Sequence, residues 1–261
     1  MSSPLLFERD GAVARIRFHR PAALNAIDRD MAQSLLEVSR SLLGADWLRA
    51  VVISGEGKAF MAGGDLARFQ ADLATAPRTA AEIIEPLHKA LAILAALPQP
   101  VLGSLHGAVA GAGVSLALAC DICIAADDTV FNLAYSRIGA SPDGSASWSL
   151  PRIVGLRKAL ELVLLSDTVD AAEALRLGMV NRVVPRGELE KETAALAARL
   201  ASGPTFAYGQ SKQLLRASLG RGLGQQLEAE QRAFCACAGS ADFAEGLDAF
   251  FNKRAAAFHG R

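Results

Sequence analysis

The chain has 261 residues, 51% of them apolar, which suits one large α/β domain or one domain with a small appendage. Lys and Arg total 27, as do Asp and Glu, so the formal net charge is zero. Nucleic acid and anionic membranes bind surfaces with an excess of basic residues. We therefore expect neither as a partner, although a local basic pocket for one phosphate-bearing ligand is compatible with this balance.

The N-terminal sequence, MSSPLLFERDG, has neither a basic start nor a long apolar run, so no secretory signal is expected. Residues 101–126 are the most membrane-like segment, but they include His106, Asp121 and several glycines. A buried strand–turn–helix–strand unit explains them better than a membrane span. These features predict a cytoplasmic protein.

Two of the four cysteines have the CxxC spacing of a redox or zinc site, at Cys120 and Cys123. No second CxxC or Cys/His pair completes a zinc set, so we interpret them as structural thiols in a reducing compartment. No group of His, Cys and carboxylate residues predicts a metal site.

In chain order, the hydrophobic pattern first alternates strands with helices. Strands are expected at residues 12–18, 50–54, 101–105 and 122–125, and helices at about 28–43, 79–97 and 114–119. Asp28 is the predicted N-cap of the first helix. This alternation is typical of a sheet whose strands are joined by crossover helices.

Helical periodicity dominates from residue 156 onward. Helices are expected at residues 157–165, 170–177, 187–201, 205–218, 222–237 and 243–251, with one short strand at 179–184. We therefore divide the chain into an α/β core, residues 1–200, and a helical C-terminal part, residues 201–261.

Two glycine-rich turns each follow an apolar strand and precede a predicted helix start: residues 57–66 (GKAFMAGGDL) and 106–116 (HGAVAGAGVSL). A helix N-terminus offers unpaired N–H groups at its positive end, and two such groups aimed at one oxygen stabilise an enolate. A tight βα turn explains either segment alone. A dinucleotide site is disfavoured because the second turn lacks the GxGxxG spacing.

Together these segments resemble the crotonase, or enoyl-CoA hydratase/isomerase, superfamily. The resemblance extends to residues 20–26 (RPAALNA), 170–184 (DAAEALRLGMVNRVV) and 250–254 (FFNKR). It implies an α/β crotonase-like spiral of stacked βα repeats with a helical C-terminal part that forms trimers or dimers of trimers. It also implies an oxyanion hole made by the N–H groups of Gly64 and Ala112, the second of which is usually Gly in the family.

The resemblance further implies an acyl-CoA substrate and no cofactor beyond its coenzyme A moiety. Residues 69–84 are expected to line the acyl end. The C-terminal helix of a neighbouring subunit often covers CoA in this family, whereas a solvated face is the plainer reading of Lys253. The implied CoA-binding residues are Ala23, Leu24, Ala62, Asp65, Phe250 and Lys253.

The residue that moves the proton is less obvious. Family hydratases use two Glu, and the matching positions here hold Ser115 and Tyr135. One carboxylate remains, Asp143, in a Pro-Asp-Gly sequence that is also a good turn. Some family isomerases carry their single acid/base Asp at this position, and aryl-CoA dehalogenases place their nucleophilic Asp there. We therefore expect an enoyl-CoA isomerase with Asp143 as its acid/base.

His88 and Tyr135 keep other functions open. Their spacing matches the catalytic His and a Trp of the dehalogenases, although the aryl-binding Trp pair is replaced by Pro86 and Leu87. A rim position for His88 on its helix is the plainer reading. The alternatives are an enoyl-CoA hydratase, an aspartyl-nucleophile dehalogenase or hydrolase, and a CoA-binding module without catalysis. We expect His106 to bond the backbone rather than to take part in catalysis.

Overall fold

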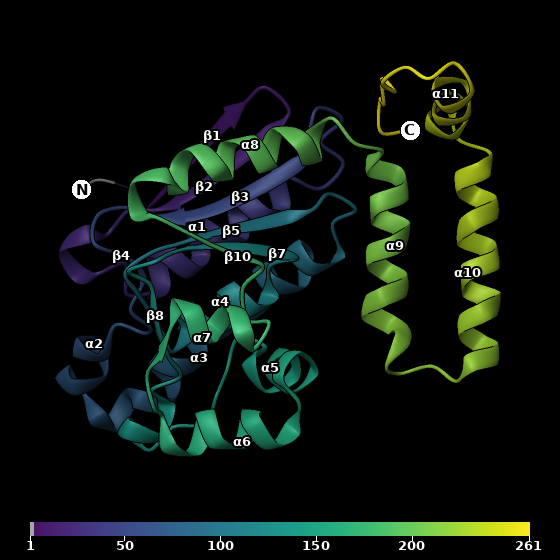
Figure 1. The fold of residues 1–261 in the computed structure, drawn as a ribbon. Coiled ribbons are helices and arrows are strands. Elements are labelled where there is room, and N and C mark those ends of the chain that lie inside the picture. The colour runs from purple at the N-terminus through teal and green to yellow at the C-terminus, as the bar shows by residue number, and fades with distance from the viewer. Residues whose placement is uncertain (1–2) are drawn as a thin grey trace.

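The computed structural model describes residues 3–261 and contains two sheets with helices packed around them (Figure 1). The larger sheet has six strands in the order β1-β2-β3-β5-β7-β10, parallel except for the β1–β2 pair. Its strands are β1 Leu5–Asp10, β2 Val13–Phe18, β3 Ala50–Gly55, β5 Val101–Leu105, β7 Ile122–Ala126 and β10 Arg182–Val184.

The smaller sheet has the order β4-β6-β8-β9, in which β4, β6 and β8 are parallel. Each of three successive repeats gives one strand to the larger sheet and the next to the smaller sheet, as β3 and β4, β5 and β6, and β7 and β8 do. This is the predicted spiral of stacked βα repeats, which is confirmed. The strands are β4 Ala59–Met61, β6 Ala108–Ala110, β8 Val130–Asn132 and β9 Val169–Asp170.

Eleven α-helices lie within the described residues, most of them close to the predicted positions. They are α1 Arg29–Ser41, α2 Leu66–Ala71, α3 Ala76–Ala96, α4 Ala112–Ala119, α5 Ala146–Val154, α6 Leu156–Leu165, α7 Ala171–Arg176, α8 Leu189–Ala201, α9 Thr205–Ser218, α10 Leu223–Ala238 and α11 Ala241–Phe251. Short 3-10 helices are η1 Pro21–Ala23, η2 Leu73–Thr75, η3 Tyr135–Ile138 and η4 Arg186–Glu188. No helix in this part of the chain has the length and apolar character that a bilayer crossing requires.

Alternating side chains of the larger sheet serve two separate cores. In β3, Val51 and Ile53 belong to the main core, whereas Ala50 and Val52 face the small core beneath α8. This follows from the period of two in a strand, and it explains why β3 is apolar throughout. The predicted N-cap is confirmed, because the Asp28 carboxylate accepts a hydrogen bond from Met31 N–H at 2.9 Å.

The elements expected from the sequence did not include the four short strands of the smaller sheet or helix α5. Two further elements differ from expectation. Strand β1 was not expected, because five of its six residues are exposed and the apolar alternation of a half-buried strand is missing. The strand expected at 179–184 begins only at Arg182. Before it, Asn181 bonds Cys123 through both its main-chain N–H and its side-chain oxygen instead of pairing as a regular strand.

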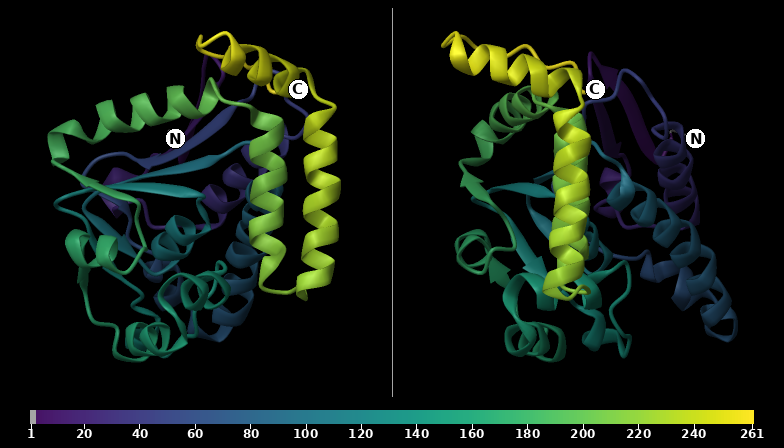
Figure 2. Two further views of the ribbon diagram at one scale, coloured as in Figure 1. Left: turned by 45° about the vertical axis from the view of Figure 1, so that its right-hand side comes forward. Right: turned by 90° about the vertical axis from the view of Figure 1, so that its right-hand side faces the viewer.

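The last three helices form an arm beside the core (Figures 1 and 2). Helix α9 is attached to the core by Asp121, whose carboxylate accepts hydrogen bonds from Lys212 Nζ at 2.7 Å and Arg216 Nη2 at 2.8 Å. The same carboxylate accepts Val101 N–H. Lys212 is largely buried, and burial lowers its pKa despite the neighbouring charge of Asp121.

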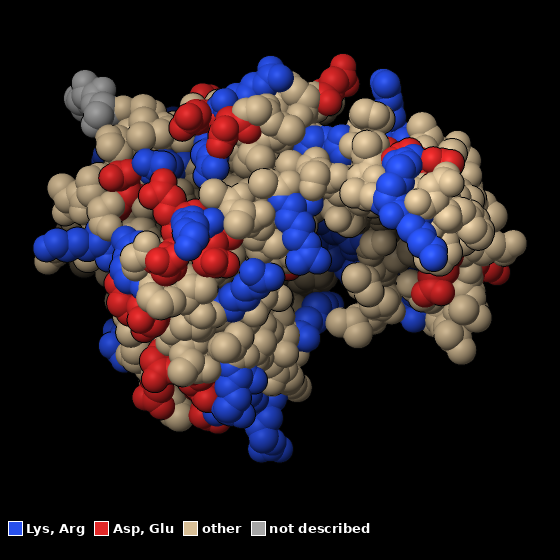
Figure 3. Space-filling model, turned by 45° about the horizontal axis from the view of Figure 1, so that its top comes forward, with Lys and Arg blue, Asp and Glu red and all other residues tan. Residues whose placement is uncertain are grey.

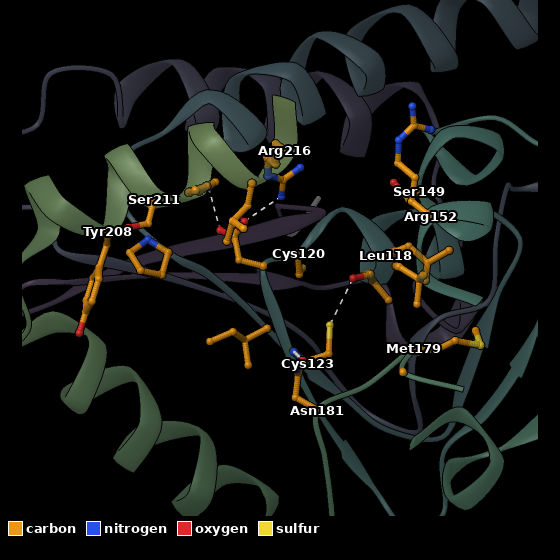
Figure 4. Close-up of a pocket in the computed structure, with 18 of the residues that line it drawn as sticks. Leu118, Cys120, Cys123, Ser149, Arg152, Met179, Asn181, Tyr208, Ser211 and Arg216 are labelled. Carbon is orange, nitrogen blue, oxygen red and sulfur yellow. Dashed lines mark hydrogen bonds and ion pairs between the residues drawn. The ribbon is translucent and has the colours of Figure 1, made fainter. Parts of the chain in front are cut away.

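A hollow separates the arm from the core, and Lys and Arg side chains gather at its mouth (Figure 3). It contains a cavity of about 780 Å³. In the close-up of this cavity, Cys123 and Asn181 come from the core, and Tyr208 and Arg216 come from α9 (Figure 4). Asp121 is the one carboxylate among the described residues that line it, and it pairs with Lys212 and Arg216.

Replacing Asp121 should loosen the arm. Asp121→Ala leaves the buried ammonium of Lys212 without its partner, so we expect the free energy of unfolding to fall by about 3 kcal/mol. Urea denaturation followed by circular dichroism measures this change. The matched control is Asp46→Ala, which removes an exposed carboxylate that makes no ion pair among residues 3–261. It should change the free energy of unfolding by no more than about 0.5 kcal/mol. Equal stability of the two variants would contradict the assigned role of Asp121.

Candidate active site

The site is built where three neighbouring parallel strands end. Strands β4, β6 and β8 pair side by side, so their carboxyl ends lie at one edge of the smaller sheet. The segments that follow these strands are the first glycine turn, the second glycine turn and the stretch that begins at Leu133. Sequence positions more than 70 residues apart are therefore brought together by strand pairing alone.

The side chain of Asn25 fixes the start of the first glycine turn by hydrogen bonds. Its buried side chain donates to the carbonyls of Glu56 and Ala59 at 2.9 and 2.8 Å, and its side-chain oxygen accepts Arg20 N–H. Leu24 and Asn25 both adopt left-handed backbone conformations, and the Leu24 carbonyl accepts Ala62 N–H at 3.0 Å. The turn expected to contact CoA is thus a rigid neighbour of the first oxyanion segment.

The two glycine turns touch each other at Gly63 and Gly111. Both residues have positive φ, 99° and 48°, which favours glycine. A Cβ added to Gly111 would lie 3.5 Å from Gly63 Cα, so the two backbones pack in direct contact. Gly64 and Ala112 directly follow these two glycines in the sequence. Their N–H groups therefore belong to neighbouring stretches of the two turns.

Both N–H groups are free to bind a ligand atom. Within the described residues, neither Gly64 N–H nor Ala112 N–H has a hydrogen-bond acceptor. Ala112 is the first residue of α4, where the N–H has no partner within the helix and the helix dipole is positive. Gly64 and Ala112 both line one cavity of about 440 Å³. Two unpaired amides in an otherwise apolar cavity can stabilise an anionic oxygen.

Most of that cavity is apolar. Phe69, Ala80, Ile83 and Ile84 lie in its wall, and all four belong to the segment expected to line the acyl end. We call this space the acyl cavity. Asp143 is the one carboxylate among the described residues that line it, and no histidine is among them. The arrangement therefore brings together an anion-binding pair of amides and a single acid/base group.

Asp143 is held by a phenol. Its Oδ1 accepts the Tyr135 hydroxyl at 2.5 Å, whereas its Oδ2 has no hydrogen-bond partner among residues 3–261. Burial, reinforced by the negative charge of Asp143, raises the pKa of Tyr135 well above its ordinary value. The phenol therefore stays protonated at neutral pH and acts as a donor to the carboxylate.

His88 lies on the other side of the Asp143 turn. Its Nε2 accepts Gly144 N–H at 3.0 Å, and it lines a second cavity of about 530 Å³ that Asp143 also borders. Adjacent residues on a helix point about 100° apart, so Leu87 of α3 faces the acyl cavity while His88 does not. The structure thus brings His88 next to Asp143 without placing it among the residues that line the acyl cavity.

The expected CoA-binding residues divide into two groups. Ala62 lines the acyl cavity, and Ala23 and Leu24 form the turn beside it. The Asp65 carboxylate is already paired with the Arg20 guanidinium at 2.9 Å. The remaining two, Phe250 and Lys253, belong to the exposed end of the arm and do not line the cavity of their own chain.

Two further residues are placed by the structure. The expected backbone role of His106 is confirmed, since its Nε2 lies 3.0 Å from the Gly57 carbonyl. Burial is the main cause that lowers the pKa of His106, followed by the positive charge of Arg186. Ser115 was expected only to occupy a position where family hydratases have Glu, and its contact with Asp143 was missed. Its place in a first helical turn is ordinary, and no sequence signal connects it with Asp143, whose main-chain oxygen its hydroxyl contacts at 2.9 Å.

Comparison with known proteins identifies the family. A sequence model described as Enoyl-CoA hydratase/isomerase matches residues 8–261. This chain belongs to the enoyl-CoA hydratase/isomerase family. Its similarity covers nearly the full length of characterised and uncharacterised relatives alike, so the fold and the general acyl-CoA chemistry apply to the whole chain.

Relatives in this family are named for different activities. The chain is 38% identical to a probable enoyl-CoA hydratase of Rhodobacter capsulatus, over 98% of this chain and 97% of that one. It is 34% identical to 1,2-epoxyphenylacetyl-CoA isomerase of Escherichia coli, over 98% of both. It is 33% identical to 4-chlorobenzoyl coenzyme A dehalogenase-2 of an Arthrobacter species, over 94% and 90%. These names support an acyl-CoA enzyme of the crotonase type.

The fold agrees with solved structures of the family. The crystal structure of an enoyl-CoA hydratase from Polaromonas sp. JS666 superposes with a TM-score of 0.93 at 34% identity, over 97% of this chain and 99% of that one. The predicted crotonase fold is therefore confirmed across the core and the helical C-terminal part.

Proposed function

We propose that this protein is an enoyl-CoA isomerase in which Asp143 moves one proton between two carbons of the acyl chain. The supporting observation is that the cavity with two unpaired amides contains one carboxylate and no histidine among its described lining residues, while the nearby Tyr135 phenol is held protonated as a donor to that carboxylate. A double-bond shift needs one group that takes and returns a proton, whereas hydration also needs an activated water.

The reaction would start with the thioester oxygen between the N–H groups of Gly64 and Ala112. Asp143 Oδ2 removes a proton from the α-carbon of a 3-enoyl thioester, and the electron pair moves onto the thioester oxygen as a dienolate. Each amide donor contributes about 3 kcal/mol to stabilising that charge. The same proton then returns to the γ-carbon, and the double bond moves from C3–C4 to C2–C3.

A second candidate is an aspartyl-nucleophile hydrolase or dehalogenase. The contact between His88 Nε2 and Gly144 N–H favours it, because a histidine beside Asp143 could activate water against an aspartyl ester. Two observations speak for the isomerase instead. His88 is outside the acyl cavity, and that cavity is lined by aliphatic residues and one phenylalanine at its far end.

Substituting the carboxylate tests the proposed role of Asp143. Asp143→Asn keeps the size of the side chain but removes its base, so isomerisation of a 3-enoyl-CoA should fall by at least about 100-fold. The measurement is the absorbance of the conjugated thioester, with crotonyl-CoA hydration followed in parallel. Hydration of crotonyl-CoA by the unsubstituted protein at a comparable rate would favour a hydratase. Halide release from a 4-halobenzoyl-CoA would favour the second candidate.

A proline substitution tests the second amide donor. Ala112→Pro replaces the amide hydrogen by the ring Cδ and so removes the donor, and proline is well tolerated at the first position of a helix. We expect kcat for the 3-enoyl-CoA to fall by about 100- to 1000-fold with the fold retained. The matched control is Ala112→Gly, which keeps the N–H and should keep most of the activity. Equal activity of the proline and glycine variants would contradict the oxyanion assignment.

We also propose that copies of this chain assemble through the arm as a trimer or a dimer of trimers. Phe250 and Lys253 do not line the acyl cavity of their own chain. Any CoA that they contact would therefore be bound to a neighbouring subunit. Large apolar side chains are exposed along the arm, namely Leu215, Leu219, Leu223, Leu227, Phe234, Phe250 and Phe251. An unpartnered apolar surface of this kind is typical of an interface.

Sedimentation velocity tests this assembly. The unsubstituted protein should sediment as a trimer or hexamer, and Leu223→Glu should shift it toward monomer because a carboxylate would be buried in the interface. Leu73→Glu is the matched control, since Leu73 of η2 is as exposed as Leu223, at 75% against 76%, and η2 belongs to the core. A monomer in the unsubstituted protein at micromolar concentration would contradict the proposal.

A further inference from the structure

The Asp143 turn is held at three separate atoms. The carboxylate Oδ1 accepts the Tyr135 hydroxyl, the main-chain oxygen accepts the Ser115 hydroxyl at 2.9 Å, and the following N–H, of Gly144, donates to His88 Nε2. These three partners come from η3, α4 and α3, which are separate in the sequence. The orientation of Asp143 therefore depends on how three elements pack around it.

Ser115 differs from the other two partners in its origin. It lies in α4, the helix that begins with Ala112, and its N–H donates to the Gly111 carbonyl at 3.2 Å. Its side chain is fully buried. A Cβ added to Gly144 would lie 2.8 Å from Ser115 Cβ, so the helix and the Asp143 turn are in direct contact. Ser115 is thus the link between the second amide donor and the carboxylate.

The hydroxyl protons can be assigned by counting donors and acceptors. Tyr135 has one hydroxyl proton, and the negatively charged Asp143 Oδ1 at 2.5 Å is its strongest acceptor. Ser115 also has one proton, which its contacts with Asp143 O at 2.9 Å and Tyr135 Oη at 3.0 Å can share. Oδ1 therefore remains bound to the phenol in either arrangement. Oδ2 is left as the oxygen that exchanges protons with a ligand.

We propose that Ser115 is a positioning residue that keeps the Tyr135–Asp143 pair in register with the Ala112 amide, so that Oδ2 faces the α-carbon of a bound thioester. This inference rests on the proposed function, because it assigns Ser115 a role in the same proton transfer. Ser115 itself touches no reacting atom. Its effect is transmitted through the main chain of Asp143 and the phenol of Tyr135.

The separation of kcat from KM gives a readout that a merely structural serine would not produce. The Ser115 hydroxyl contacts both the main-chain oxygen of Asp143 and the Tyr135 hydroxyl, so it fixes the direction of Oδ2. Loss of Ser115 loosens that direction. Proton transfer should then slow while substrate binding, in which Ser115 takes no part, is retained.

The test uses Ser115→Ala in the full-length protein. We expect kcat for a 3-enoyl-CoA to fall about tenfold with little change in KM. Tyr135→Phe should lower kcat in the same way and further. Ser115→Cys, which keeps the size and a weak donor, should restore part of kcat. The matched control is Ser104→Ala, because Ser104 is also buried and its hydroxyl bonds Thr193 in the core.

A second assay separates this inference from the proposed function. Exchange of the α-protons of butyryl-CoA in D₂O, followed by NMR, requires the oxyanion amides and a positioned base but no double-bond shift. If the protein exchanges these protons without isomerising the 3-enoyl-CoA, the proposed function fails, and slower exchange in Ser115→Ala still supports the positioning role. If Ser115→Ala keeps the unsubstituted rate in both assays, the positioning role is overturned.

Discussion

The parallel pairing of β4, β6 and β8 is the constraint on which the rest of the site depends. Because the carboxyl ends of parallel neighbours meet at one edge, each strand delivers its following segment to the same place. The contact between Gly63 and Gly111 then sets how closely the first two segments approach. A side chain at either position would be strained, because both residues have positive φ. The anion-binding geometry is therefore a property of the main chain rather than of polar side chains.

An apolar cavity makes this arrangement effective. Charge–dipole interactions strengthen when water is excluded, so two amides in a mostly aliphatic lining stabilise an anion better than they would at the surface. The same surroundings keep the Tyr135 phenol protonated beside Asp143. The two amides, the Asp143 carboxylate and the Tyr135 phenol therefore all depend on the same apolar surroundings.

The division between core and arm separates two kinds of interaction. The core is closed by apolar packing on both faces of the larger sheet, whereas α9 is attached through charged groups that converge on Asp121. The arm leaves its large apolar residues exposed. Phe250 and Lys253 lie at the end of this arm and do not line the cavity of their own chain.

The sequence by itself was sufficient for the family, for most strands of the larger sheet and for the residues of the candidate site, but it did not indicate the four short strands of the smaller sheet. Strong apolar periodicity located β3, β5, α1 and α9 closely, and the glycine turns and Asp143 marked the site before any contact was known. Strand β1 escaped because an exposed edge strand has no apolar alternation.

Only the tertiary structure decided which side chains act on Asp143. Leu87 and His88 are adjacent in the sequence, yet helix geometry turns one into the acyl cavity and the other toward the opposite side of the Asp143 turn. Ser115 reaches Asp143 across 28 residues of chain because α4 packs on that turn. Such contacts depend on how separate elements dock, which local periodicity and spacing do not encode.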